Sequence, residues 1–196
     1  VLGCGSSSGT PVINCDCDTC LSGLAENQRS RCAAWLHSDD GASIVIDTGT
    51  DFRTQALRER IPHVDAVLYT HPHADHLNGI DDLRAFCYQQ KAAIPVYGNG
   101  FTLANIQSRF DYAFLEPRDF WDKPVLKAHG LQAAQTIAGP PVQAFTVPHV
   151  RWSVSAFPIG NIASLTDLND VSDEAIPQLQ GWDYLFLVCS MVDAFR

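Results

Sequence analysis

Four side chains that commonly bind metals fall within six residues of this chain: His71, His73, Asp75 and His76. Three imidazoles and one carboxylate favour Zn²⁺, Mn²⁺ or iron, because Ca²⁺ and Mg²⁺ prefer sites built only of oxygen. The cluster follows an apolar stretch, Ala66 to Tyr69, that predicts a buried strand, and it precedes a helical pattern from Leu77 to Tyr88. Open α/β sheets bind ligands at the carboxyl ends of their strands. The cluster therefore predicts an α/β fold with a metal site at one sheet edge.

The spacing within the cluster indicates two metal ions rather than one. His71 and His73 are two residues apart, so an extended backbone points both to the same side. Asp75 and His76 are adjacent and can face a second ion if the chain turns into a helix there. Paired ions ~3.5–4 Å apart clamp the attacking and leaving oxygens of a displacement. The alternative is a histidine-rich loop of solvated residues in which Asp75 merely caps the helix.

The cluster resembles the HxHxDH signature of the metallo-β-lactamase superfamily, and three further segments are similar to that family in order. Ser43 to Gly49 resembles its strand followed by Asp-Thr-Gly, which implies that Asp47 supports the metal loop from behind the ligands. Val147 to His149 and Ser164 to Asp167 resemble later strand ends that carry ligands. The resemblance implies a first metal bound by His71, His73 and His149, a second bound by Asp75 and His76, and Asp167 bridging the two.

The resemblance also implies the αββα sandwich of that superfamily, formed by a single metallo-hydrolase domain over residues 1–196. Members of the superfamily usually continue with further strands and a helix. These supply the last histidine of the second metal, and no such histidine follows Asp167 here. We therefore expect a domain that is incomplete at its C-terminus, and an inactive metal-binding fragment is one alternative to an active enzyme.

The first residues narrow the resemblance to one branch. Val1 to Pro11 is a strand end followed by glycines and serines, whose exposed N–H groups can form an anion-binding nest. Taken alone, such a loop is more often an ordinary turn. Beside the metal motif it is similar to the loop of the phosphodiesterase branch, which includes ribonuclease Z and the cyclic-phosphate phosphodiesterase of phosphonate degradation.

A second cluster of ligands, Cys15, Cys17 and Cys20, suits a structural zinc ion if a fourth ligand arrives from elsewhere. Cys32 is the nearest candidate in the sequence. The cyclic-phosphate branch instead uses a histidine near the C-terminus, which this chain lacks. Disulfides, free thiols and other metals are the alternatives. We expect reduced cysteines and a cytoplasmic protein, because the sequence shows no signal peptide.

Charge and length limit the partners. At 196 residues the chain can bury one substantial core, and its formal net charge is −9. Long nucleic acids usually meet a basic face, so we expect a small-molecule phosphodiester rather than a nucleic acid. No apolar run is long enough for a membrane span. The sequence leaves open whether the protein forms a homodimer.

The function that the resemblance implies is hydrolysis of a small or cyclic phosphodiester by a hydroxide that bridges two divalent ions, zinc or manganese. Asp75 would orient the attacking water. Arg84 could pair with a phosphate, although a solvated helix residue is the commoner role for such an arginine. The alternatives are a thioester hydrolase, a β-lactamase, a ribonuclease Z-like nuclease, or a non-catalytic metal-binding module.

Periodicity predicts the remaining elements. The predicted strands are Ala33–Leu36, Ile44–Ile46, Val64–Tyr69, Ile94–Gly98, Val142–Val147, Val154–Ile159, Ile162–Leu165 and Tyr184–Val188. The predicted helices are Phe52–Glu59, Ile80–Gln90, Thr102–Phe110 and Ser172–Gln180, and Asp111–Lys127 is predicted to be a loop bordering the site.

Overall fold

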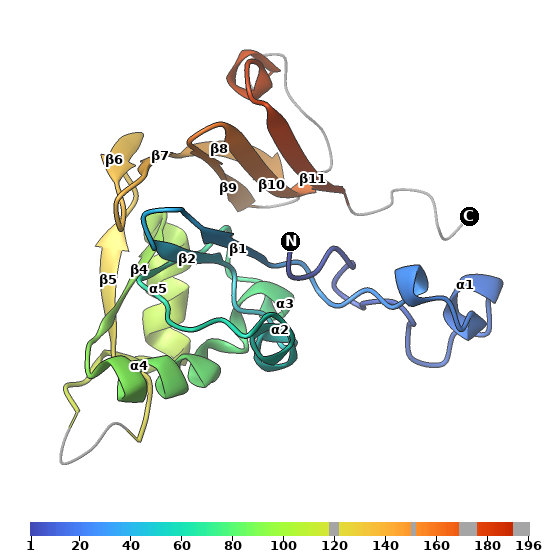
Figure 1. The fold of residues 1–196 in the computed structure, drawn as a ribbon, viewed down its shortest axis with the longest axis horizontal. Helices are drawn as coiled ribbons and strands as arrows, with labels where there is room; N and C mark the ends of the chain where they lie inside the picture. The colour runs from blue at the N-terminus through green and yellow to red at the C-terminus, as the bar shows by residue number, and fades with distance from the viewer. Residues whose placement is uncertain (118–121, 150–151, 169–175, 190–196) are drawn as a thin grey trace.

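Two facing sheets form the body of the protein, and helices cover the outer face of the first sheet (Figure 1). The computed structural model describes residues 1–117, 122–149, 152–168 and 176–189. The N-terminal segment, with the short helix α1 (Asp18–Leu21), extends away from this body. The predicted α/β fold with two stacked sheets is therefore confirmed.

The first sheet has the strand order β1-β2-β3-β4-β5. β1 is antiparallel to β2, and the other neighbours are parallel. Because parallel strands end at the same edge, the residues that follow β2, β3 and β4 meet there. The strands are β1 (Ala34–His37), β2 (Ser43–Ile46), β3 (Ala66–Leu68), β4 (Ile94–Gly98) and β5 (Leu126–Gly130).

The second sheet has the order β11-β10-β9-β7-β6, and β8 pairs with β9 beside it. β10 runs antiparallel to β9 and parallel to β11. The tight turn at Gly160, with a φ of 61°, is the predicted β9–β10 hairpin. The strands are β6 (Ala134–Thr136), β7 (Pro141–Gln143), β8 (Phe145–His149), β9 (Trp152–Ile159), β10 (Ile162–Leu168) and β11 (Tyr184–Cys189).

Four helices follow strands of the first sheet and pack on it, with 3₁₀ turns between them (Figure 1). Helix α5 begins where the Asn99 side chain accepts a hydrogen bond from the Thr102 N–H, which satisfies a free helix donor. The helices are α2 (Phe52–Glu59), α3 (Ala74–Leu77), α4 (Arg84–Gln90) and α5 (Gly100–Arg109). The 3₁₀ turns are η1 (Ala25–Asn27), η2 (Ile80–Leu83), η3 (Asp111–Phe114) and η4 (Ile176–Leu179).

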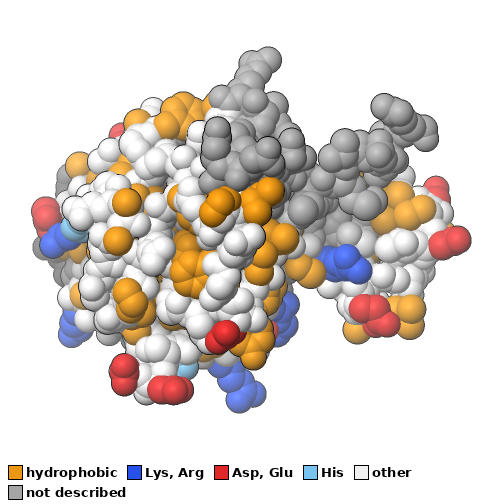
Figure 2. Space-filling model, turned by 90° about the horizontal axis from the view of Figure 1, so that it is seen from above, with side chains coloured by type: hydrophobic (Ala, Val, Ile, Leu, Met, Phe, Trp, Pro, Cys, Tyr) orange, Lys and Arg blue, Asp and Glu red, His pale blue; other side chains and the backbone are white. Residues whose placement is uncertain are grey.

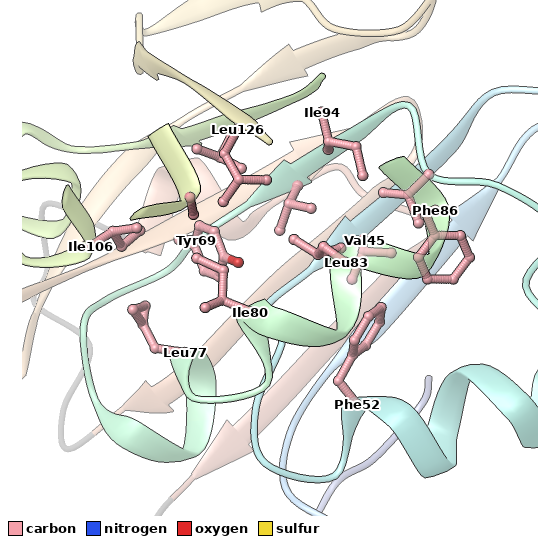
Figure 3. Close-up of a cluster of buried hydrophobic side chains, with 14 of the residues drawn as sticks. Val45, Phe52, Tyr69, Leu77, Ile80, Leu83, Phe86, Ile94, Ile106 and Leu126 are labelled. Carbon is pink, nitrogen blue, oxygen red and sulfur yellow. The ribbon is translucent and has the colours of Figure 1, made fainter. Parts of the chain in front are cut away.

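The core forms on both faces of the first sheet. On the helical side, Tyr69, Leu77 and Ile80 lie together, and Phe52 packs toward Phe86 (Figure 3). Between the sheets, a second cluster joins the two: Ile44, Ile46, Ala66, Leu68, Ile137, Val142, Phe157 and Ile159. Strands β2 and β3 are buried on both faces, which explains their continuous apolar sequence.

The face that carries the second sheet exposes hydrophobic side chains, with most charges toward its margins (Figure 2). The exposed side chains of β11 are Tyr184, Leu185, Phe186 and Leu187. No helix within the described ranges is long and apolar enough to cross a membrane.

Several helices and strands begin or end at other residues than the sequence predicted. The predicted strand 142–147 is two strands, β7 and β8, with a break at Ala144; both pair with β9, and β7 also pairs with β6. The predicted helix 80–90 starts as the 3₁₀ turn η2 and becomes α-helical only at Arg84. The predicted loop 111–127 contains η3 and the start of β5. Residues 172–175 of the predicted helix 172–180 lie outside the described ranges, and Ile176–Leu179 forms a 3₁₀ turn.

Candidate metal centre

The histidine-rich segment leaves the sheet edge in an extended conformation and then turns into a helix. His73 is extended, with φ −66° and ψ 153°, and α3 begins at Ala74. Asp75 and His76 therefore lie on the first helical turn instead of diverging along a strand. The turn predicted at Asp75 is present.

The first group of ligand atoms joins His71 and His73 to Asp167 of the second sheet. Nε2 of His71 lies 2.8 Å from Nδ1 of His73 and 3.2 Å from Oδ2 of Asp167. His71 is fully buried, whereas His73 and Asp167 are partly exposed. This arrangement leaves an open side on a group that could hold one ion.

The second group shares the same aspartate. Nε2 of His76 lies 3.0 Å from Oδ2 of Asp167 and 3.2 Å from Oδ2 of Asp75. This nitrogen is buried, yet the angles at these contacts do not make a hydrogen bond within the described residues. Buried polar atoms are nearly always paired. Donor atoms that converge on one another without hydrogen-bonding geometry fit coordination of a metal ion.

Asp47 orients both buried imidazoles from behind. Its Oδ1 accepts the Thr70 N–H (2.9 Å), and its Oδ2 accepts the Thr70 hydroxyl (2.7 Å). The single hydrogen of that hydroxyl is used in the bond to Asp47. Its oxygen therefore accepts a hydrogen bond from the N–H at Nδ1 of His71, 2.9 Å away. Oδ2 also lies 2.6 Å from Nδ1 of His76. In neutral imidazoles this network leaves both Nε2 lone pairs facing the ligand groups.

Two aspartates reach these positions through a left-handed backbone. Asp47 has a φ of 61° and Asp167 a φ of 56°, which residues other than glycine adopt infrequently. At Asp167 the β10–β11 register shifts between Thr166 and Leu168. A β-bulge of this kind re-aims a side chain. The bulge turns Asp167 toward the metal loop of the other sheet.

Charges in the cluster depend on one another. Burial would raise the pKa of Asp167, but the facing imidazoles of His71 and His76 outweigh it and hold that pKa far below its usual range. Burial also raises the pKa of Asp75, and contact with His76 outweighs it, so the net shift is downward. Burial lowers the pKa of His76, but Asp47, Asp167 and Asp75 raise it well above its usual range. These carboxylates supply the negative charge that a cation requires.

Two glycines allow the Asp-Thr-Gly segment to pass beneath the metal loop. A Cβ atom on Gly49 would lie 1.8 Å from the carbonyl oxygen of Asp75, and one on Gly79 would lie 2.1 Å from that of Gly49. The Thr48 N–H donates to the His76 carbonyl (2.9 Å), and the Gly79 N–H donates to the Thr48 carbonyl (2.9 Å). The backbones are therefore in direct contact.

Arg109 is a supporting residue that the sequence reasoning missed. From the end of α5 it donates to the Pro72 carbonyl (2.8 Å) and to Oδ1 of Asn78 (2.5 Å), so it holds both ends of the metal loop. Thr70 was also missed, although its position directly before His71 is a usable signal. No local pattern marks Arg109, because its contact is 37 residues away.

Two of the predicted site residues, His149 and Arg84, are not among the described ligand groups. His149 ends β8, where it pairs in register with Trp152, but its side chain lies outside the described part of the structure. Arg84 pairs with Asp81 (3.7 Å) and donates to the Asp122 carbonyl (3.4 Å). It lines a hollow formed by α2, η2 and α4 whose lining does not include the histidine–aspartate groups. Its phosphate-binding role stays a prediction.

The cysteine cluster is assembled at the start of α1. Sγ of Cys15 lies 3.4 Å from Sγ of Cys17, and Sγ of Cys20 accepts a hydrogen bond from the Val12 N–H (3.3 Å). The three sulfur atoms form a group that could hold a metal, and Cys32 lies outside this group. Cys32 is 6% exposed in the core. Cys32, the nearest candidate along the sequence, thus does not join the three sulfur atoms here, and the fourth ligand stays open.

The N-terminal loop that predicted an anion nest borders a hollow of about 300 Å³. Three arginines line it together with Ser8, Gly9 and Thr10: Arg29, Arg31 and Arg58. Arg31 donates to the Ser7 carbonyl (3.2 Å) and pairs with Asp51 (3.0 Å) just before α2. The loop is thus tied to the segment that carries Asp47.

Comparison with known proteins places this geometry in a family. Residues 42–195 match the family described as the β-lactamase superfamily domain. The crystal structure of a new diphosphatase from the PhnP family superposes with a TM-score of 0.85 and 34% identity, covering 95% of this chain and 72% of that chain.

Two curated relatives are similar in sequence over different spans. The octanoyltransferase of Porphyromonas gingivalis (strain ATCC BAA-308 / W83) is 35% identical over 189 residues, which is 95% of this chain and 38% of that protein. The hydroxyacylglutathione hydrolase of Stenotrophomonas maltophilia (strain R551-3) is 38% identical over 68 residues, or 34% of this chain and 25% of that protein. The chain thus spans well under half the length of either relative.

Proposed function

The chain belongs to the β-lactamase superfamily, and within it we propose a metal-dependent hydrolase of small or cyclic phosphodiesters. One observation carries the proposal: two groups of metal-ligand atoms share Asp167 at the edge of the first sheet. The similarity to a diphosphatase over nearly the whole chain supports cleavage of a phosphorus–oxygen bond over a thioester or β-lactam. The net charge of −9 supports a small substrate over a nucleic acid.

The residues that would hold two divalent ions, zinc or manganese, are His71 and His73 on one side, Asp75 and His76 on the other, and Asp167 between them. His149, at the end of β8, is the further ligand that the family resemblance assigns to the first ion. When bound, such ions lower the pKa of water and offset charge on phosphoryl oxygens.

The chain itself supplies orientation and a base. Asp47 and Thr70 fix the imidazoles, so the ligand atoms need little rearrangement. Like an ordinary aspartate, Asp75 is ionised at neutral pH, and contact with His76 lowers its pKa further, so its carboxylate can orient the attacking water and accept its proton. The side chain of Asp75 is 13% exposed, which admits a water molecule.

A structural zinc ion on Cys15, Cys17 and Cys20 belongs to the same proposal. Three sulfurs within ligand distance of one another, and a pKa of Cys17 lowered first by the backbone N–H of Cys20, support thiolate binding. The ion would hold the N-terminal loop in place.

The test is hydrolysis by the purified chain loaded with Mn²⁺ or Zn²⁺. The panel contains bis-p-nitrophenyl phosphate, a cyclic phosphate, a diphosphate ester, a thioester and a chromogenic β-lactam. We expect turnover of the phosphate esters, and a loss of at least about 100-fold in His71→Ala.

The matched control is His63→Ala, because His63 is a partly exposed histidine that pairs with Asp65 away from the cluster. It should retain turnover. Hydrolysis of the thioester or β-lactam alone, or equal loss in both variants, would overturn the proposal.

A further inference from the structure

Two exposed aromatic rings stand beside the metal loop without a role in metal binding. Trp152, at the start of β9, is 37% exposed, and Phe101, in the first turn of α5, is 48% exposed. The Trp152 ring centroid lies 4.6 Å from that of His73 and 5.3 Å from that of Phe101. The rings therefore form a continuous series that starts at a metal-ligand histidine.

A hollow of about 510 Å³ adjoins this series. Its volume falls within the range of small-molecule sites. Trp152 both contacts His73 and lines the hollow, so the hollow begins one ring away from the candidate metal centre. The lining residues are Asn99, Gly100, Phe101, Thr146, Trp152 and Ser153.

Hydrogen bonds fix the three elements that build the hollow. The Ser155 N–H donates to the Thr70 carbonyl (2.9 Å), which ties β9 to the metal loop. The Asn99 side-chain amide donates to the Ser155 hydroxyl (3.4 Å), which ties the start of α5 to β9. The hollow and the ligand groups therefore keep a fixed relative position, as a two-part substrate site requires.

The side chains that line the hollow favour one chemical class of ligand. The described residues that line the hollow include no Lys, Arg, Asp or Glu, so these residues offer a second phosphate no counter-charge. Two exposed aromatic faces favour a planar ring, and the hydroxyls of Thr146 and Ser153 can bond to its polar edge. Gly100 leaves space, since a Cβ built on it meets no atom within 4 Å.

We infer that this hollow binds a neutral planar heteroaromatic ring, of the nucleobase class, in a substrate whose phosphodiester lies at the metal centre. The inference rests on the proposed function for the position of the phosphodiester. It goes beyond that function because it assigns Trp152 and Phe101 to substrate selection.

The test compares two substrates that differ only in the ring: adenosine 2′,3′-cyclic phosphate and methyl riboside 2′,3′-cyclic phosphate. The protein loaded with Mn²⁺ should show a kcat/KM at least about tenfold higher for the adenosine compound, as expected for base–aromatic stacking. Trp152→Ala should bring the ratio close to one, and Trp152→Phe should retain part of it.

Gly100→Leu tests the hollow without removing an aromatic ring. The added side chain should fill the space and lower the ratio, while thermal unfolding shows that the fold is kept. Tyr88→Ala is the control, because Tyr88 is a 59% exposed aromatic residue on α4 that does not line the hollow. It should leave the ratio unchanged.

Adenosine binding, measured by calorimetry on the metal-free protein, separates this inference from the proposed function. Hydrolysis of both substrates at equal kcat/KM would overturn the ring site and leave the function standing. Adenosine binding that is lost in Trp152→Ala and Gly100→Leu, without hydrolysis of either substrate, would support the ring site and overturn the function.

Discussion

Asp47 is a buried carboxylate that orients two histidines of the metal loop. It is fully buried in a left-handed conformation and accepts hydrogen bonds from the backbone and hydroxyl of Thr70 and from His76. Through Thr70 it also sets the tautomer of His71. A single side chain behind the ligands thus orients one histidine of each group.

Asp47→Asn should weaken binding of Zn²⁺ or Mn²⁺ by about 10–100-fold, the usual effect of removing a partner behind a metal-ligand histidine. Three donors point at the two oxygens of Asp47. The NH₂ group of an amide would have to face either the Thr70 N–H or the pair formed by the Thr70 hydroxyl and Nδ1 of His76, so the network that sets the tautomers is broken. Competition with a chromogenic chelator measures the affinity. Asp65→Asn is the control, because Asp65 is half-exposed and pairs with His63. Equal affinity in wild type and Asp47→Asn would contradict the prediction.

The cysteines should differ in reactivity because only the thiolate is a nucleophile. The backbone N–H of Cys20 lowers the pKa of Cys17, so its thiolate forms at a lower pH than that of an ordinary cysteine. Burial raises the pKa of Cys32 to about 12, so its thiolate is almost absent at neutral pH. In metal-free protein, iodoacetamide should modify Cys17 early and Cys32 last, as followed by mass spectrometry.

The same labelling with iodoacetamide is then repeated in the presence of Zn²⁺. If the cysteine cluster binds Zn²⁺, the ion should protect Cys15, Cys17 and Cys20 but leave the exposed Cys4 reactive. Modification of Cys32 as fast as Cys17 would show that the described burial is wrong. Unchanged reactivity of the cluster in Zn²⁺ would count against the structural zinc ion.

At the scale of elements, close backbone contact positions the metal loop. The segment after β2 touches the first turn of α3 with no room for a side chain at Gly49. Arg109 at the end of α5 bonds to Pro72 at the start of the same loop. The ligands therefore sit on a loop that is held by two helices and a strand end.

Gly49→Ala should destabilise the fold by about 2–3 kcal/mol, because the new methyl group would meet the Asp75 carbonyl at 1.8 Å. Thermal unfolding should shift by about 4–12 °C for a domain of this size. Gly23→Ala is the control, since a Cβ there meets nothing within 4 Å. A Tm of Gly49→Ala equal to that of the control would contradict the close contact.

Elements with a strong hydrophobic pattern could be predicted from the sequence. Elements whose limits depend on pairing with other strands could not. Buried strands β2 and β3 were predicted because they are apolar on both faces. Strand β5 pairs along β4, but its sequence Leu126 to Gly130 carries little strand pattern. The division of 142–147 into β7 and β8 accompanies the extra pairing of β7 with β6, because both halves pair with β9. Such limits arise from pairing, which local sequence does not contain.

At the scale of the whole molecule, the candidate metal centre joins the two sheets. The candidate ligands His71, His73, Asp75 and His76 follow β3 of the first sheet, whereas Asp167 comes from β10 of the second. Bound ions would therefore link the two sheets, in addition to the apolar cluster between them.

Metal ions should raise the thermal stability of the whole domain through this link. A ligand present at 100 times its Kd stabilises the native state by about 2.7 kcal/mol. Differential scanning calorimetry should show a higher Tm in Zn²⁺ or Mn²⁺ and a lower one after chelation. Asp167→Asn should lose more than half of the gain.

The control for the shared aspartate is Asp183→Asn. Asp183 lies just before β11 and accepts a hydrogen bond from Asn161, so it belongs to the second sheet but not to the ligand groups. It should keep the full metal-dependent gain in Tm. The same gain in Asp167→Asn would contradict a link between the sheets.

By itself, the sequence determined that four side chains of metal-binding type cluster after a buried strand, because residues six or fewer apart are held together by the chain. It also indicated the fold class, since periodicity reports which residues face a core. Only the tertiary structure decided that Asp167 meets these ligands, that Arg109 supports their loop and that Trp152 and Phe101 stand beside them. These contacts join residues tens of positions apart. Their geometry depends on sheet pairing, a bulge and a left-handed residue, which no local pattern specifies.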